Sequence, residues 1–344
     1  MRIAQVSTLY ESVPPKAYGG TERVVSYLTE ELVQLGHDVT LFASADSTTR
    51  ARLIASCPCA LRLIEDTTDR QAWHFAMLEQ VVRQSPDFDL IHYHVDYLHF
   101  PFSRRLACPH LTTLHGRLDT PGLEQLYQEF ADIPVMSISD AQRWPLPWLN
   151  WQATVYHGLP RDLYTFRDQP GDYLAFLGRI ATEKRPDRAV EIARRANVPL
   201  VIAAKVDRAD QAYFEQSIRE LFCSPLVSFQ GEVTELGKDD FLGHARALLF
   251  PIDWPEPFGL VMVEALACGT PVIAFRNGSV TEIIDDGITG FIVDTIEEAV
   301  DAVGRIAQLN RRLCRQAFEE RFTATRMVRR YLEIYENVLA SQPI

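Results

Sequence analysis

Two carboxylates stand out by their spacing in the last third of this 344-residue chain. Glu256 lies in a stretch stiffened by two prolines, and Glu264 follows with seven residues between them. The apolar run that contains Glu264 predicts a buried helix over Leu260–Cys268, ended by Gly269. Because one carboxylate accepts two hydroxyl hydrogen bonds at once, two spaced carboxylates can hold two sugars.

Backbone amides are the second feature of this stretch. Phe258, Gly259 and Leu260 stand where the predicted helix begins, so their N–H groups favour an anion such as phosphate. Phosphate on the amides and sugars on Glu256 and Glu264 together describe a sugar nucleotide. A capping glutamate followed by a glutamate on a solvated face would give the same spacing, and spacing alone does not decide between the two.

A pair of cations lies earlier in the chain. Arg179 is expected at the end of a buried strand, and Lys184 follows five residues later, before a predicted helix. Two cations beside helix-terminal amides suit a diphosphate, and arginine supplies forked donors for it. The alternative is a pair of solvated surface charges.

With its flanking Pro-Glu-Pro-Phe-Gly and Ala-Cys-Gly-Thr-Pro-Val-Ile segments, the glutamate region resembles the E-x7-E signature of family-4 retaining glycosyltransferases, which have the GT-B fold. The resemblance implies that Glu256 contacts the donor sugar near its C3 hydroxyl and that Glu264 holds the ribose hydroxyls. It also implies that Arg179 and Lys184 neutralise the leaving diphosphate.

Further site residues come from the same resemblance. It implies that Gly19 and Gly20 touch the donor phosphate and that His115 faces the transferred sugar near its C6. The loop with Gly231 and Val233 would bind the nucleobase through main-chain groups. Read without the resemblance, the glycine pair is an ordinary loop and His115 is a histidine at the end of a strand.

The predicted fold class is α/β: a GT-B protein with two facing Rossmann-like domains and a C-terminal helix that crosses back to the first. We expect an acceptor-binding domain over residues 1–165, a nucleotide-sugar-binding domain over 166–325 and the returning helix over 326–344. Thr21 is expected to cap the first helix, which begins at Glu22. Gly287 to Val293 is expected to close the second domain like a hairpin.

Composition restricts the classes of binding partner and the cellular compartment that we expect. The formal net charge of −12 argues against nucleic acid or an anionic membrane as the main partner. No apolar run is long enough for a membrane-spanning helix, although peripheral membrane contact is not excluded. The chain enters a strand directly after Met1, and its six cysteines are scattered, so we expect a cytoplasmic protein with reduced thiols.

The expected function is retaining transfer of a hexose-type sugar from a UDP- or GDP-sugar to a hydroxyl acceptor, either a small molecule or an oligosaccharide. No cofactor or catalytic metal is expected. The pattern His92-x-His94-x-Asp96 allows a metal site, but no matching ligand cluster is evident elsewhere. The alternatives are a sugar-nucleotide epimerase or phosphorylase-like enzyme, or a non-catalytic sugar-binding protein. The tryptophans at 144, 148 and 151 form either an acceptor or membrane contact, or aromatic packing, and oligomeric state stays open.

Overall fold

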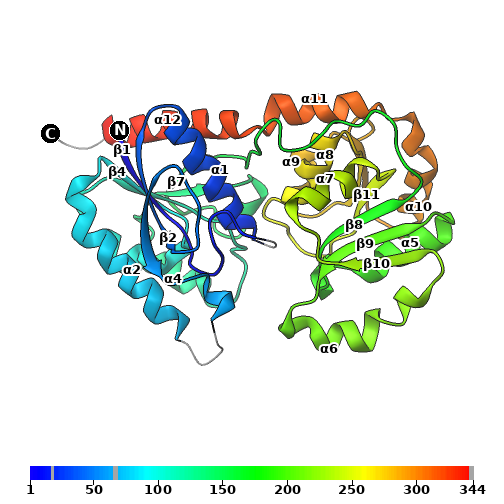
Figure 1. The fold of residues 1–344 in the computed structure, drawn as a ribbon, viewed down its shortest axis with the longest axis horizontal. Helices are drawn as coiled ribbons and strands as arrows, with labels where there is room; N and C mark the ends of the chain where they lie inside the picture. The colour runs from blue at the N-terminus through cyan, green and yellow to red at the C-terminus, as the bar shows by residue number, and fades with distance from the viewer. Residues whose placement is uncertain (17–18, 65–68, 341–344) are drawn as a thin grey trace. The chain divides into compact units, whose positions relative to one another are not determined.

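The computed structural model describes residues 1–16, 19–64 and 69–340 and divides the chain into two units (Figure 1). Unit 1 contains Met1–Pro160 and the chain from Ala324 onward, whereas unit 2 contains Arg161–Thr323. Unit 2 is therefore a continuous segment placed before the last helix of unit 1. These borders fall a few residues before those drawn from the sequence.

Unit 1 is built on a seven-stranded parallel sheet with the order β3-β2-β1-β4-β5-β6-β7. The central strands β1 and β4 are almost entirely buried, as expected for a parallel sheet covered on both faces, although each carries one buried polar side chain, Gln5 and His92. The strands are β1 (Arg2–Val6), β2 (Asp38–Ser44), β3 (Arg52–Cys57), β4 (Leu90–Tyr93), β5 (His110–Thr113), β6 (Val135–Ser137) and β7 (Trp151–Thr154). The helices are α1 (Gly20–Gln34), α2 (Arg70–Gln84), α3 (Phe100–Ser103), α4 (Leu123–Glu129) and α12 (Ala324–Ala340).

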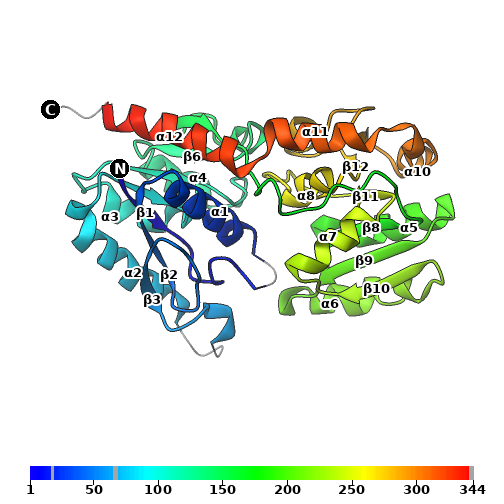
Figure 2. The same cartoon turned by 45° about the horizontal axis from the view of Figure 1, so that its top comes forward.

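The last helix, α12, completes unit 1. It packs against α1, and both helices are visible along the upper part of this unit in Figure 2. Its aromatic side chains Tyr331 and Tyr335 are fully buried and hydrogen bond to groups of the sheet. The prediction that the chain ends on the first Rossmann-like unit is therefore confirmed.

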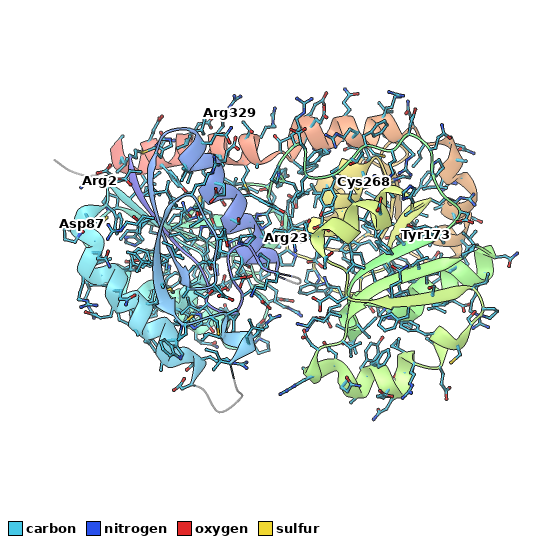
Figure 3. The ribbon with its side chains drawn as sticks, viewed as in Figure 1. Arg2, Arg23, Asp87, Tyr173, Cys268 and Arg329 are labelled. Carbon is cyan, nitrogen blue, oxygen red and sulfur yellow. The ribbon has the colours of Figure 1, made fainter. Side chains whose placement is uncertain are left out.

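Unit 2 repeats the design with a six-stranded parallel sheet in the order β10-β9-β8-β11-β12-β13. Apolar side chains of α5 and α10 pack on this sheet to form its main core, and α8 packs on β11 and β12. Figure 3 marks Tyr173, just before β8, and Cys268, the last residue of α8. The strands are β8 (Leu174–Arg179), β9 (Leu200–Lys205), β10 (Val227–Gly231), β11 (Ala247–Phe250), β12 (Val272–Phe275) and β13 (Gly290–Val293). The helices are α5 (Pro186–Ala196), α6 (Gln211–Tyr213), α7 (Glu235–Gly243), α8 (Leu260–Cys268), α9 (Val280–Ile283), α10 (Ile296–Arg305) and α11 (Arg311–Arg321).

Two local expectations are corrected, and two strands lack a sequence signal. Gly19, not Thr21, occupies the N-cap position of α1, and its absent side chain leaves room for Pro15, which a Cβ would approach to 2.8 Å. The segment that ends at Val293 is not a hairpin, because β13 pairs with β12 in parallel. The edge strands β3 and β7 are not predicted, since an edge strand is only partly buried and lacks a continuous apolar run.

A buried arginine ties unit 2 together. Only 6% of Arg311 is exposed, and its guanidinium donates to the carbonyl oxygens of Arg167, Gly243 and Ala245 at 2.7–3.0 Å. It also donates to the hydroxyl of Thr270 at 2.7 Å. One side chain therefore joins the entry to unit 2, the end of α7 and the turn after α8.

We predict that Arg311→Met lowers the free energy of unfolding of unit 2 by about 3 kcal/mol, because it leaves buried carbonyl oxygens without donors. The matched control is Arg312→Met on the same helix. The Arg312 side chain is 67% exposed in its ion pair with Asp168, so its loss should cost less than about 0.5 kcal/mol. Urea unfolding measures both, and equal costs would contradict the prediction.

Candidate functional site

In both units some of the candidate residues lie at the carboxyl ends of the parallel strands where the strand order reverses. In unit 2 the reversal falls between β8 and β11. Arg179 ends β8, and the loop after β11 carries Glu256. Open parallel sheets bind their ligands at such a switch point. A backbone bond from the Asp253 N–H to the Glu183 carbonyl, at 2.8 Å, joins the two loops.

The loop with Glu256 is clamped from its other side by the segment after β12. The N–H of Ser279 donates to the Glu256 carbonyl at 3.0 Å, and its hydroxyl donates to the Phe258 carbonyl at 2.7 Å. The Asn277 amide donates to the Ile252 carbonyl at 3.0 Å. Gly278 lies so close to Glu256 that a Cβ there would collide with the Glu256 backbone. The backbone of Glu256 is therefore held in place by its neighbours.

Lys184 and Glu256 form an ion pair, so two residues chosen 72 positions apart in the sequence meet. Their side chains are only 17% and 10% exposed. Trp254 completes the cluster: its indole donates to the Glu256 carboxylate at 3.1 Å, and the Lys184 ammonium lies 4.8 Å from its ring centroid. A buried charge pair is tolerated when both members are fully hydrogen bonded, and the indole supplies one of these bonds.

Arg179 lies among acids, which the sequence reading did not anticipate. Its guanidinium is 2.5 Å from the Glu183 carboxylate, 3.2 Å from Asp210 and 3.9 Å from Asp207. Burial, together with the charges of Glu183 and Asp207, raises the pKa of Asp210 although Arg179 opposes this. An anion that binds Arg179 must therefore share or replace these carboxylates.

Glu264 sits apart from Glu256, on the buried face of α8, with 3% exposure. The ammonium of Lys238, on α7, lies 2.9 Å from its carboxylate. The segment that leads into α7 holds Gly231, at a positive φ of 71°, and half-buried Val233. The predicted base-binding loop and the predicted ribose ligand are thus linked through α7.

The start of α8 has the expected form. Phe258 is buried, and Gly259 occupies the N-cap position with a left-handed φ of 80°, which favours glycine. A Cβ on Gly259 would lie 2.7 Å from the Met262 methyl group. Leu260 is the first helical residue, so its N–H is one of those that a helix leaves unpaired within itself.

Unit 1 carries the remaining candidates near its own switch point, between β1 and β4. Gly19 and Gly20 start α1 after the loop that follows β1. His115 follows β5, and Asp96 fixes its backbone: the His115 N–H donates to that carboxylate at 3.1 Å. The His115 ring stacks on His157, with centroids 5.2 Å apart. His94, His115 and His157 therefore form one cluster beyond the carboxyl ends of the strands.

Burial keeps these histidines neutral. It lowers the pKa of His115 to about 3 and the pKa values of His92, His94 and His157 well below 6.5, with neighbouring histidine charges adding to the effect. The ring nitrogens of His92 and His94 are used in hydrogen bonds within unit 1. In the part of the chain that the structure describes, no group of three His, Cys, Asp or Glu side chains is placed to hold a metal ion.

The three tryptophans of residues 144–151 differ in how far they are buried. Trp144 and Trp148 are 70% and 42% exposed, whereas Trp151 is half-buried and donates to the Leu146 carbonyl at 3.0 Å. The packing interpretation therefore holds for Trp151 alone. None of the described helices is both long and apolar enough to cross a membrane.

Sequence reasoning missed the residues that act on the site through others. Lys238, Trp254 and Asp96 each contact a predicted site residue from a different element. Gln5 and Tyr335 are further examples in unit 1. Trp254 was within reach of sequence reasoning, since it stands two residues before Glu256. Asp96 was noticed only as a possible metal ligand, and it instead accepts from the His115 N–H. The remaining residues are distant in the chain from the groups that they contact and carry no local signal.

Solved structures share the whole architecture. The sucrose-phosphate synthase of Thermosynechococcus elongatus matches with a TM-score of 0.81 and 18% identity over 99% of this chain and all of the other. Anabaena HepE, described in complex with UDP and glucose, matches with a TM-score of 0.74 and 17% identity over 98% of this chain and all of HepE. The two parallel sheets and these neighbours identify a GT-B fold.

Two family models match the sequence. "Glycosyltransferase Family 4" covers residues 18–181, and "Glycosyl transferases group 1" covers residues 165–320. Together the two models match residues 18–320, so the sequence resembles family-4 glycosyltransferases along most of its length, and the fold is GT-B. The D-inositol 3-phosphate glycosyltransferase of Mycobacterium leprae is 31% identical over 44% of this chain and 35% of that protein. The matched parts cover about a fifth to a third of the curated relatives' length.

The clamp on Glu256 leads to a prediction. Gly278→Ala should displace the Glu256 loop and lower the free energy of unfolding by more than about 2 kcal/mol, because the added Cβ would lie 2.7 Å from the Pro255 carbonyl carbon and closer still to Glu256. The control is Gly287→Ala. Gly287 also has a positive φ, 74°, but a Cβ there meets nothing within 4 Å, so only the conformational cost of about 1 kcal/mol remains. Hydrogen exchange of residues 252–260 should rise in the first variant alone; unchanged exchange would refute the clamp.

The neutral histidines predict a pH dependence. Below pH 6.5 the unfolded chain binds protons that the folded His92, His94, His99, His115 and His157 do not, so unit 1 loses stability as pH falls from 6.5 towards 5. Each contributes up to about 1.4 kcal/mol per pH unit. Unit 2 has a single histidine in its sequence and serves as the internal control. Hydrogen exchange against pH should show unit 1 opening first; the reverse order would contradict this account.

Proposed function

We propose that this protein is a retaining glycosyltransferase that moves a hexose-type sugar from a nucleoside-diphosphate sugar to an acceptor hydroxyl, without a metal ion and in the cytoplasm. The observation that carries the proposal is the meeting of Lys184 with Glu256 just before the start of α8. A cation, a carboxylate and the N-terminal end of helix α8 at one strand edge match the phosphate and hydroxyl groups of such a donor.

The ion pair explains how the empty site can be stable and still bind an anion. In the free protein, Lys184 and Glu256 neutralise each other in a poorly hydrated place. When the donor arrives, a phosphate oxygen shares the ammonium, and sugar hydroxyls donate to the carboxylate. Each charge then keeps a partner throughout. The acids around Arg179 would serve in the same way, holding its guanidinium until a phosphate oxygen competes for it.

The reaction follows from these contacts. The bond between the sugar C1 and the diphosphate oxygen breaks, and the acceptor oxygen bonds to C1 on the same face. The acceptor proton passes to a donor phosphate oxygen. Arg179, Lys184 and the α8 amides offset the charge that grows on the diphosphate, which is the main contribution asked of the protein. Glu256 orients the sugar, Glu264 holds the ribose and His115 faces the transferred sugar.

The nucleotide is proposed to be UDP or GDP. UDP is the first choice, since Anabaena HepE, which has the same fold, is described with UDP and with UDP-glucose. The acceptor is proposed to be a small molecule or an oligosaccharide. The curated relatives differ in the products that their names imply, so they support transfer in general and no particular acceptor.

We predict that one of UDP-, GDP- and ADP-glucose stabilises the protein against heat and is slowly hydrolysed without an acceptor. Lys184→Ala should weaken this binding roughly tenfold to a hundredfold, the value of one charge-assisted hydrogen bond. Glu256→Gln should reduce hydrolysis more than binding. Arg195→Ala is the control, because Arg195 forms an exposed ion pair at the far end of α5. If no nucleotide or nucleotide sugar binds the wild type, the proposal is wrong.

Turnover without an acceptor also distinguishes a glycosyltransferase from the main alternative, an epimerase. An epimerase would convert the nucleotide sugar into an isomer instead of releasing free sugar. Product analysis by NMR distinguishes free glucose from a second nucleotide sugar, and the latter would overturn the transferase proposal.

A further inference from the structure

A continuous chain of hydrogen bonds connects His115 to the last helix through the interior of unit 1. The His115 Nε2 and His94 Nδ1 atoms are 2.9 Å apart, and His94 Nε2 is 2.8 Å from the Gln5 amide oxygen. The Gln5 amide nitrogen donates to the Tyr335 hydroxyl at 3.2 Å, and that hydroxyl lies 2.7 Å from His92 Nδ1. The chain continues from His92 Nε2 to the hydroxyls of Thr113 and Tyr331.

Such a chain has one direction throughout. The histidines are neutral, so each ring carries one N–H and one acceptor nitrogen, and a bond on one side of a ring decides the bond on the other. Gln5 is the only member with a fixed division between acceptor and donor, because its amide has an oxygen and an NH₂. The orientation of that amide therefore determines the tautomers of His94 and His115, which follow it with no hydroxyl between them.

The Gln5 oxygen faces His94. His94 must then donate from Nε2, which leaves its Nδ1 as an acceptor, so His115 must donate from its own Nε2. This leaves His115 Nδ1 without a proton. On the other side, the Gln5 NH₂ donates to Tyr335, which can donate in turn to His92. The short 2.7 Å contact suits a phenol O–H donating to an imidazole nitrogen.

The end of the hydrogen-bond chain at His115 supports the same direction. His115 Nδ1 is buried and has no hydrogen-bond partner among the described residues. In the reverse direction it would be a buried N–H with a fixed direction and no acceptor, which proteins rarely tolerate. In the direction given by Gln5, the surplus hydrogen falls on the hydroxyl of Thr113 or Tyr331, which can rotate.

We propose that Gln5 and His94 are positioning residues that hold His115 in its Nε2–H tautomer, so that Nδ1 accepts a hydrogen bond from a hydroxyl of the transferred sugar. This inference rests on the proposed function for the identity of the ligand. It specifies the chemistry of that contact: a sugar hydroxyl fits, because it can donate, whereas a phosphate or carbonyl oxygen does not fit.

The tautomer can be measured without any ligand. In ¹⁵N-histidine-labelled wild-type protein, His115, assigned with the His115→Asn variant, should show a protonated Nε2 and an unprotonated Nδ1. Gln5→Glu keeps an acceptor oxygen opposite His94 and should preserve this pattern. Gln5→Leu removes the acceptor and should give a mixture of tautomers. Tyr331→Phe is the matched control, since it removes a hydroxyl from the far end of the chain and should change nothing at His115. A protonated Nδ1 in the wild type overturns the inference whatever the variants do.

Kinetics test the contact itself. UDP-glucose is compared with UDP-6-deoxy-6-fluoroglucose, or with the equivalent pair for the nucleotide found above, because fluorine cannot donate. The fluoro compound should be turned over roughly threefold to tenfold more slowly by the wild type, the value of one neutral hydrogen bond. Gln5→Leu should slow the parent sugar by a similar factor, reduce the discrimination and leave the affinity for UDP alone unchanged. Equal turnover of the two sugars by the wild type overturns the proposed contact. If instead no nucleotide binds while the tautomer is as stated, it is the proposed function that fails.

Discussion

The buried ion pair between Lys184 and Glu256 sets the requirements for the structure around it. Removing two charges from water costs several kcal/mol per ion, and the pair compensates only when its geometry is held closely. The loops from β8, β11 and β12 meet that need through main-chain hydrogen bonds, with Trp254 as a further donor. The rigidity of this corner of unit 2 is thus a condition for keeping charge there, and the same rigidity suits a site that must stabilise charge in a reaction.

Unit 1 also buries polar side chains, but these carry no charge. Its interior holds several histidines, a glutamine and two tyrosines, all neutral and hydrogen bonded to one another. A neutral network costs less to bury than an ion pair, but its members depend on each other, because each proton position constrains the next. Unit 2 therefore keeps a paired charge at its strand ends, whereas unit 1 keeps a neutral hydrogen-bonded network.

The sequence predicted local structure well wherever a short motif marks it. The bounds of α8 were predicted to the residue, because Gly259 and Gly269 mark both of its ends. Arg179 and Lys184 were found because strand and helix signals surround them. What could not be predicted is contact between distant segments: Lys238 beside Glu264, or the acids around Arg179. Nothing near Gln5 in the chain indicates that its amide orientation matters. Such facts arise from packing, which a single sequence does not display.

The division of the chain has a consequence for biosynthesis. Unit 2 is continuous, but unit 1 needs α12, which follows all of unit 2 in the sequence. On the ribosome, the part that emerges first is consequently the last to be completed. Until α12 docks, the polar interior around His92 and Gln5 lacks the Tyr335 hydroxyl that both contact. Unit 2 can fold while it emerges, whereas the histidine cluster of unit 1 is completed only once α12 has been synthesised and has docked. The unit whose first strand leaves the ribosome first is therefore completed after the unit that follows it.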